Sequence, residues 1–146
     1  MKKIIILLLI TFAVVGCTNT TYKKVKLSSI YYNEGNFIDI KASDLKDKET
    51  YLLFTYNSYC NFEIPCDEVF LSVMKDLKID VLKMPFEEFK KTSLYEKVKY
   101  APSIIIVKNN EIIDFLDANK NEDLKYYQNS KEFASWLKER LVIEWY

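Results

Sequence analysis

The chain has 146 residues, with 21 basic and 21 acidic side chains, and therefore no formal net charge at pH 7. A balanced charge gives no basic field that would attract nucleic acid, so we expect no nucleic-acid partner. Histidine is absent, which removes the usual general base at neutral pH and excludes Ser-His and Cys-His hydrolase chemistry.

The first sixteen residues predict a signal peptide. Lys2 and Lys3 give a positive start, the stretch Ile4 to Val15 is apolar except for Thr11, and the small residue Gly16 ends it. A transmembrane helix needs roughly 20 apolar residues to cross the bilayer core. We therefore expect residues 1–16 to be a signal peptide that does not remain as a membrane span.

The end of this segment, Val14-Val15-Gly16-Cys17, resembles the lipobox of bacterial lipoproteins. In that family the cysteine is diacylated and becomes the new N-terminus, which implies a lipid such as palmitate on Cys17 and a location on the extracytoplasmic face of the cell membrane. Two acyl chains suffice for stable anchoring. The alternative is an ordinary cleaved signal peptide with Cys17 as a stray thiol. Residues 17–36 are then the lipidated cysteine and a tether, which is polar from Thr18 to about Lys24.

The remaining residues 37–146 are enough for one compact domain and too few for two. Ile38 and Ile40 predict a short strand, and Ala42 to Lys48 a short helix. Tyr51 to Tyr56 is a β-prone run between polar segments, which is typical of a buried strand.

From Pro65 the apolar residues recur every three or four positions, which predicts a helix to about Lys78. Proline suits its first turn, where no backbone N–H is needed. Ile79 to Met84 is β-prone and predicts a second strand, although its alternation is imperfect because Lys83 falls on the face of Ile79 and Val81.

The second half predicts a further helix over Phe86 to Lys99 and a central strand over Ile104 to Val107. Lys108 to Glu111 contains two asparagines, which tolerate the left-handed conformations of tight turns, so Ile112 to Leu116 returns as a hairpin partner. A last helix begins with Ser130 as its N-cap. Strands separated by helices pair in parallel and a hairpin pairs antiparallel, so we expect an α/β fold with a mixed sheet.

Two cysteines remain after Cys17, namely Cys60 and Cys66. In an exported protein this pair is expected to meet oxidising conditions and can close on itself.

The order of elements from Phe37 to Leu141 resembles the thioredoxin fold, which implies a three-layer sandwich with a mixed central sheet and flanking helices. The segment Val98 to Glu111, which contains Ala-Pro-Ser before a buried strand, looks like the segment where thioredoxins carry their cis-proline. The resemblance implies that Pro102 is a cis-proline beside an active-site disulfide. It also implies that the backbone of Ala101 pairs with a substrate peptide.

A second match is Thr55 to Cys60, in which Tyr59-Cys60 stands where thioredoxins have Trp-Cys. By resemblance, Cys60 is the nucleophile, Cys66 the resolving cysteine and Tyr59 a substrate-binding residue. The sequence departs from the family in its spacing, because five residues instead of two separate the cysteines. It also has Phe54 where the family places a buried acid.

The charges around the second cysteine differ as well, since Glu63, Asp67 and Glu68 surround Cys66 and oppose a thiolate there.

Three functions follow from this reading. The first is thiol-disulfide exchange with the thiols or disulfides of exported proteins through Cys60 and Cys66. The second is a permanent disulfide that pins the loop, and the third is a redox-inactive binding module that holds an extended peptide near Ala101 and Pro102. Small lipoproteins of this kind also resemble accessory proteins of bacteriocin export. We expect no cofactor and no metal, because the two glycines and the scattered carboxylates fit neither a phosphate loop nor a metal site.

Overall fold

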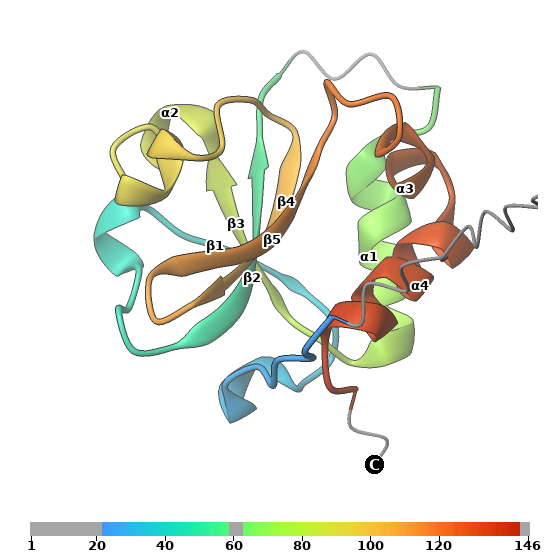
Figure 1. Cartoon of the computed structure of the whole chain (residues 1–146), viewed down its shortest axis with the longest axis horizontal. Helices are drawn as coiled ribbons and strands as arrows, with labels where there is room; N and C mark the ends of the chain where they lie inside the picture. The colour runs from blue at the N-terminus through green and yellow to red at the C-terminus, as the bar shows by residue number, and fades with distance from the viewer. Residues whose placement is uncertain (1–21, 59–62, 144–146) are drawn as a thin grey trace, which may run out of the picture.

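The structure is a computed structural model, which describes residues 22–58 and 63–143. One five-stranded sheet forms its centre, in the order β1-β3-β2-β4-β5 (Figure 1). β3 is parallel to both β1 and β2, whereas β4 is antiparallel to β2 and to β5. The mixed sheet confirms the prediction from the sequence. The strands are β1 (Phe37–Asp39), β2 (Thr50–Tyr56), β3 (Val81–Pro85), β4 (Ser103–Lys108) and β5 (Glu111–Asp117).

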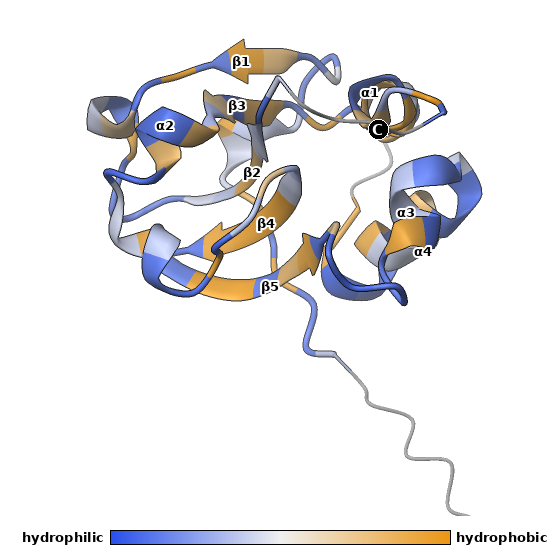
Figure 2. Cartoon of the chain, turned by 90° about the horizontal axis from the view of Figure 1, so that it is seen from above, coloured by the Kyte–Doolittle hydropathy of each residue, from blue (hydrophilic) through white to orange (hydrophobic). Residues whose placement is uncertain are grey.

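Helices cover both faces of this sheet. Figure 2 shows α1, α3 and α4 on one side and α2 on the other, which makes three layers. The α-helices are α1 (Cys66–Leu77), α2 (Phe86–Phe89), α3 (Leu124–Gln128) and α4 (Ser130–Arg140), and the short 3₁₀ helices are η1 (Ser29–Tyr31), η2 (Ala42–Asp44) and η3 (Ser93–Glu96).

The central strands and the longest helix follow the apolar patterns of the sequence. β2 and β4 are buried along almost their whole length, as continuous apolar runs require. Pro65 is the N-cap of α1, whose apolar residues face the sheet and α4. Phe70 of α1 packs its ring against Phe54 of β2 at 5.3 Å and Phe133 of α4 at 4.5 Å, measured between ring centroids. These contacts place the core between the sheet and the α1–α4 pair.

The hairpin between β4 and β5 also forms as predicted. Asn109 and Asn110 have positive φ angles of 51° and 63°, and Lys108 pairs with Glu111 across the turn. Asparagine adopts this left-handed conformation more readily than most residues, which explains the two-residue connection.

The predicted helix over Phe86 to Lys99 is wrong. α2 ends at Phe89, and Thr92 has an extended conformation with φ −93° and ψ 157° before η3 begins. The Thr92 hydroxyl donates a hydrogen bond to the Phe89 carbonyl at 2.8 Å. Threonine here offers the backbone a local partner that competes with continuing the helix.

Two smaller predictions also need correction. The N-cap of α4 is Asn129 and not Ser130, because the Asn129 side chain accepts hydrogen bonds from the amides of Lys131 at 2.9 Å and Glu132 at 3.3 Å. The expected helix from Ala42 to Lys48 is only the single 3₁₀ turn η2. The helix α3 was not predicted.

The expected tether over residues 17–36 is wrong for its described part, because residues before β1 pack on the same core, in which Leu27 and Tyr31 are buried. The buried carboxylate of Asp80 accepts hydrogen bonds from the amides of Gly35 at 2.9 Å and Asn36 at 2.7 Å. Gly35 has a φ of 82° and lies so close to α1 that an added Cβ would be 2.3 Å from the carbonyl oxygen of Met74. This turn therefore requires glycine.

Candidate functional site

A small cavity lies where the carboxyl end of β2, the start of α1 and the loop before β4 meet. It has a volume of about 110 Å³. Its walls are mostly apolar, with one amide, one carboxylate, one ammonium group and one cysteine among them. The lining residues are Phe54, Tyr56, Asn57, Pro65, Cys66, Asp67, Lys83 and Pro102.

Cys66 is the first residue of α1, and only 3% of it is exposed. A sulfur at this position lies near the amides of the first helical turn, whose partial positive charge stabilises a negatively charged group. Asp67 and Glu68 follow in the same turn, so their carboxylates oppose that effect, as the sequence predicted.

The loop before β4 supplies the opposite wall of the cavity. The peptide bond between Ala101 and Pro102 is cis, as the sequence resemblance implied. Pro102 is buried and lines the same cavity as Cys66. The fold therefore brings together two residues that are 36 positions apart in the sequence.

Three side chains hold successive carbonyl groups of this loop. The Ser103 hydroxyl donates to the carbonyl of Tyr100 at 2.8 Å. The amide of Asn57, at the end of β2, donates to the carbonyl of Ala101 at 3.1 Å.

The third is the hydroxyl of Tyr127 from α3, which lies 3.0 Å from the carbonyl of Pro102 and 2.8 Å from that of Leu116. Burial raises the pKa of the Tyr127 hydroxyl well above its usual value, and nearby Cys66 raises the pKa further. The hydroxyl therefore keeps its proton at neutral pH and remains a donor to the loop. The cis-proline loop is thus fixed by side chains from β2, α3 and β4.

Lys83 on β3 brings a positive charge to the cavity. Its Cα pairs in register with that of Phe54, the residue at which the sequence departs from the buried acid of thioredoxins. Without a carboxylate there, the ammonium group of Lys83 lies 4.9 Å from the ring centroid of Phe37 and 4.7 Å from that of Tyr56. It also lies 3.8 Å from a carboxylate oxygen of Asp67. Lys83 therefore offsets part of the negative charge near Cys66.

The structure thus places three of the predicted site residues, Cys66, Ala101 and Pro102, at one location. Cys60 and Tyr59 lie outside the described residues, and so does Cys17. Their predicted roles remain predictions.

Three residues of the site, Asn57, Lys83 and Tyr127, were not predicted from the sequence. Lys83 had a signal, because it interrupts the apolar face of its strand. No local sequence pattern marked Asn57 and Tyr127, since their hydrogen-bond partners are distant in the sequence.

Residues 22–58 and 63–143 contain no group of three or more Cys, Asp or Glu side chains that could hold a metal ion. Over the same ranges, no helix is both long and apolar enough to cross a membrane.

The solved structures similar to this chain include three thioredoxins. A thioredoxin variant from Halobacterium salinarum NRC-1 aligns with a TM-score of 0.52 and 11% sequence identity, over 78% of this chain and 96% of that protein. Thioredoxin f from spinach chloroplast has a TM-score of 0.44 and 16% identity over 75% of this chain and 98% of its own. A thioredoxin from Nicotiana alata has a TM-score of 0.41 and 16% identity over 77% of this chain and 98% of its own. No protein-family model matches the sequence, and no curated protein is significantly similar to it.

The architecture defines an α/β three-layer protein with a mixed five-stranded sheet. More specifically, the chain has a thioredoxin-like fold, as the sequence resemblance predicted.

Proposed function

We propose that this chain is a membrane-anchored, extracytoplasmic thioredoxin-like protein that exchanges thiols and disulfides with exported proteins through Cys60 and Cys66. The observation that carries the redox part is the cavity that Cys66 shares with the cis-proline Pro102. Cys66 lies at the N-terminus of a helix, and the cis-proline loop, whose Ala101 carbonyl accepts a hydrogen bond from Asn57, lies opposite. The fold is one on which thiol-disulfide exchange is known to occur.

The reaction would run in two balanced steps. The thiolate of Cys60 attacks one sulfur of a partner's disulfide, which forms a mixed disulfide and releases the partner's other sulfur as a thiolate. The thiolate of Cys66 then attacks the Cys60 sulfur and releases the partner's second thiolate. The partner gains two electrons and this chain becomes a disulfide, and the reverse sequence oxidises a partner.

The membrane part of the proposal rests on the first seventeen residues. A lipid on Cys17 would hold the domain outside the cytoplasm, where disulfides persist and where exported proteins are the available partners.

Turnover of a peptide disulfide tests the redox part. Residues 18–146 should accelerate the reduction of the peptide by dithiothreitol. Cys60→Ser alone and Cys66→Ser alone should each reduce the rate to the uncatalysed background. Ser58→Ala changes an exposed neighbour and should keep the wild-type rate. A wild-type rate equal to that of the double cysteine variant would contradict the proposal.

A second candidate function is a redox-inactive binding module. Ile64 and Tyr100, which lie beside the cavity-lining segments, are 46% and 54% exposed, and such apolar side chains suit an extended peptide. Phe54 also takes the place of the acid that would handle protons. If turnover is absent, the affinity for a peptide without cysteine is measured in the wild type and in the double cysteine variant. Equal affinity in the two would favour this function.

A further inference from the structure

The first described residues are fixed firmly to the domain. The amide of Val25 donates to the carbonyl of Arg140 at 2.8 Å, and the amide of Val142 donates to the carbonyl of Val25 at 2.9 Å. The guanidinium of Arg140 lies over the ring of Tyr22, 4.1 Å from the ring centroid. From Tyr22 onward, the N-terminal segment is therefore part of the folded domain.

The distance from this point to the proposed lipid is short. Only residues 18–21 lie between Cys17 and Tyr22, and even a fully extended chain of this length spans at most about 18 Å. A compact domain of this size has a radius of gyration of about 14 Å and is about 35 Å across. If Cys17 carries the lipid, as the proposed function requires, only the side of the domain near Tyr22 can reach the bilayer.

That side carries a hollow of about 320 Å³ with an unusual lining. Its aromatic rings each lie under a cation. The ammonium of Lys120 is 5.2 Å from the ring centroid of Phe115, and that of Lys125 is 4.8 Å from that of Tyr126. The guanidinium of Arg140 lies between two rings, those of Tyr22 and Trp136.

Acidic side chains are also present, but most of them are engaged within the protein. Asp114 forms an ion pair with Arg140. Asp123 accepts a hydrogen bond from the amide of Asp117 at 2.9 Å. Glu122 lines the hollow as well, and the ammonium of Lys125 forms an ion pair with Glu132 at 3.3 Å. The lining holds three basic side chains and three acidic ones, so the hollow itself adds no net positive charge.

We propose that this tether-proximal face, formed by the accessible side chains of Tyr22, Phe115, Lys120, Lys125 and Tyr126 over the buried Trp136 and Arg140, rests in the phospholipid headgroup layer of the membrane that holds the anchor. Tyrosine rings are enriched at the membrane–water interface, and lysine side chains attract lipid phosphates. The exposed lysines Lys23 and Lys24 next to the tether supply the net positive charge of this side of the domain.

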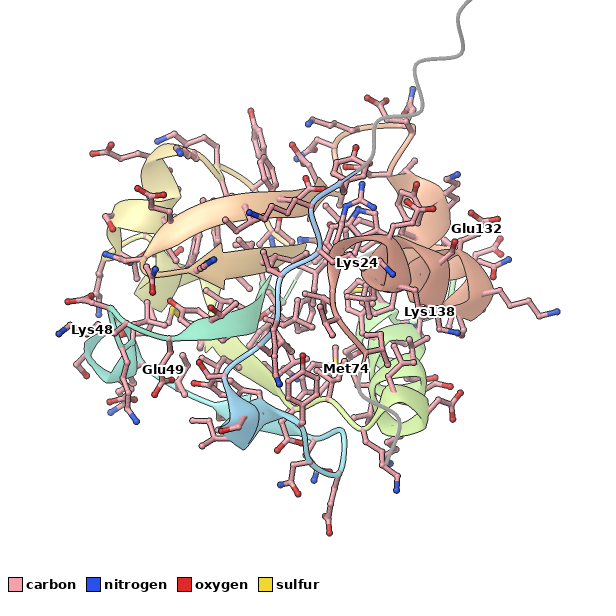
Figure 3. All side chains as sticks on the ribbon, turned by 60° about the horizontal axis from the view of Figure 1, so that its bottom comes forward. Lys24, Lys48, Glu49, Met74, Glu132 and Lys138 are labelled. Carbon is pink, nitrogen blue, oxygen red and sulfur yellow. The ribbon has the colours of Figure 1, made fainter. Side chains whose placement is uncertain are left out.

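The proposal fixes the orientation of the domain. In Figure 2 the first described residues of the chain lie beside β5, on the side of the sheet opposite β1. In Figure 3 Lys48 lies at the left edge of the view and Lys24 near its centre, so the two are well separated. The edge formed by β1 therefore points away from the bilayer, where a partner can approach it.

Lysine footprinting on vesicles tests this orientation. The lipidated chain is reconstituted in phosphatidylcholine vesicles containing phosphatidylglycerol, and each lysine's rate of acylation by a soluble ester is measured by mass spectrometry. In a second arm, six histidines replace residues 1–17 and bind a nickel-chelating lipid. Because the chain has no histidine of its own, this anchor holds the domain at one point only. Residues 18–146 without vesicles are the reference.

The expected result is at least about a threefold slower acylation of Lys120 and Lys125 on vesicles, with Lys41 and Lys48 unchanged. Equal protection of all four lysines, or stronger protection of Lys48, would overturn the orientation. A chain from cells that carries no lipid would contradict the membrane part of the proposed function, whereas the histidine-anchored arm would still decide whether the face contacts lipid.

Discussion

The hydrogen bond from Asn57 to the cis-proline loop makes a sharp prediction for substrate selectivity. Asn57→Ala removes the donor that holds the carbonyl of Ala101 at 3.1 Å. A neutral, partly buried hydrogen bond contributes about 1 kcal/mol net, and this energy corresponds to a factor of about five in an equilibrium or a rate. The loop that would bind the peptide therefore becomes less well ordered.

The expected result is a roughly fivefold lower kcat/KM for a peptide disulfide. The rate with glutathione disulfide and the reduction potential should both stay unchanged, because neither depends on peptide docking. Asn57→Asp should lower the peptide kcat/KM further, because a carboxylate then faces the Ala101 carbonyl. Asn121→Ala, at an exposed position in a turn, serves as the matched control.

Two results would refute this reasoning. If Asn57→Ala slowed glutathione disulfide and the peptide equally, Asn57 would act on the cysteines and not on docking. If neither rate changed, the cis-proline loop would not depend on this hydrogen bond.

Three further predictions concern stability. Gly35→Ala should destabilise the domain by at least about 2 kcal/mol in urea unfolding, because it adds a Cβ at positive φ within 2.3 Å of a carbonyl oxygen; a loss below about 1 kcal/mol would contradict the close packing. The hydroxyl of Thr55 is buried with no hydrogen-bond partner in residues 22–58 and 63–143. Thr55→Val should therefore raise the free energy of unfolding by about 1 kcal/mol, and a lower free energy of unfolding would count against this. Burial, and then nearby carboxylates, raise the pKa of Tyr51 to about 12. The folded state therefore favours the protonated form of Tyr51. Its contribution to stability is fully present below about pH 10, and the free energy of unfolding falls by up to about 2 kcal/mol as pH rises to about 12. Tyr51→Phe should remove part of that fall, and an unchanged pH dependence would contradict this assignment.

The sequence predicted the elements whose apolar pattern is long and continuous. β2, β4 and α1 formed where expected, because burial of such runs determines both their type and their place. Local competition decided the elements that were predicted wrongly. The hydroxyl of Thr92 ended α2 early, and Asn129 rather than Ser130 capped α4.

The site was predicted only where a family motif marked it. Pro102 was identified from the residues around it, whereas Asn57 and Tyr127 contact the cis-proline loop from 44 and 25 positions away. Such contacts depend on strand order and on the placement of α3, which no local pattern contains. Lys83 was visible as an irregularity in its strand, but its nearness to Asp67 follows only from the packing of α1 on the sheet.

The reduction potential of the Cys60–Cys66 pair tests the central claim most directly. Residues 18–146 are equilibrated with glutathione or dithiothreitol buffers, and the fractions of dithiol and disulfide are determined by thiol alkylation. A working oxidoreductase predicts a potential between about −270 and −120 mV. A potential below about −300 mV, or a disulfide that never forms, would contradict thiol-disulfide exchange and leave a structural disulfide or a thiol-independent binding module.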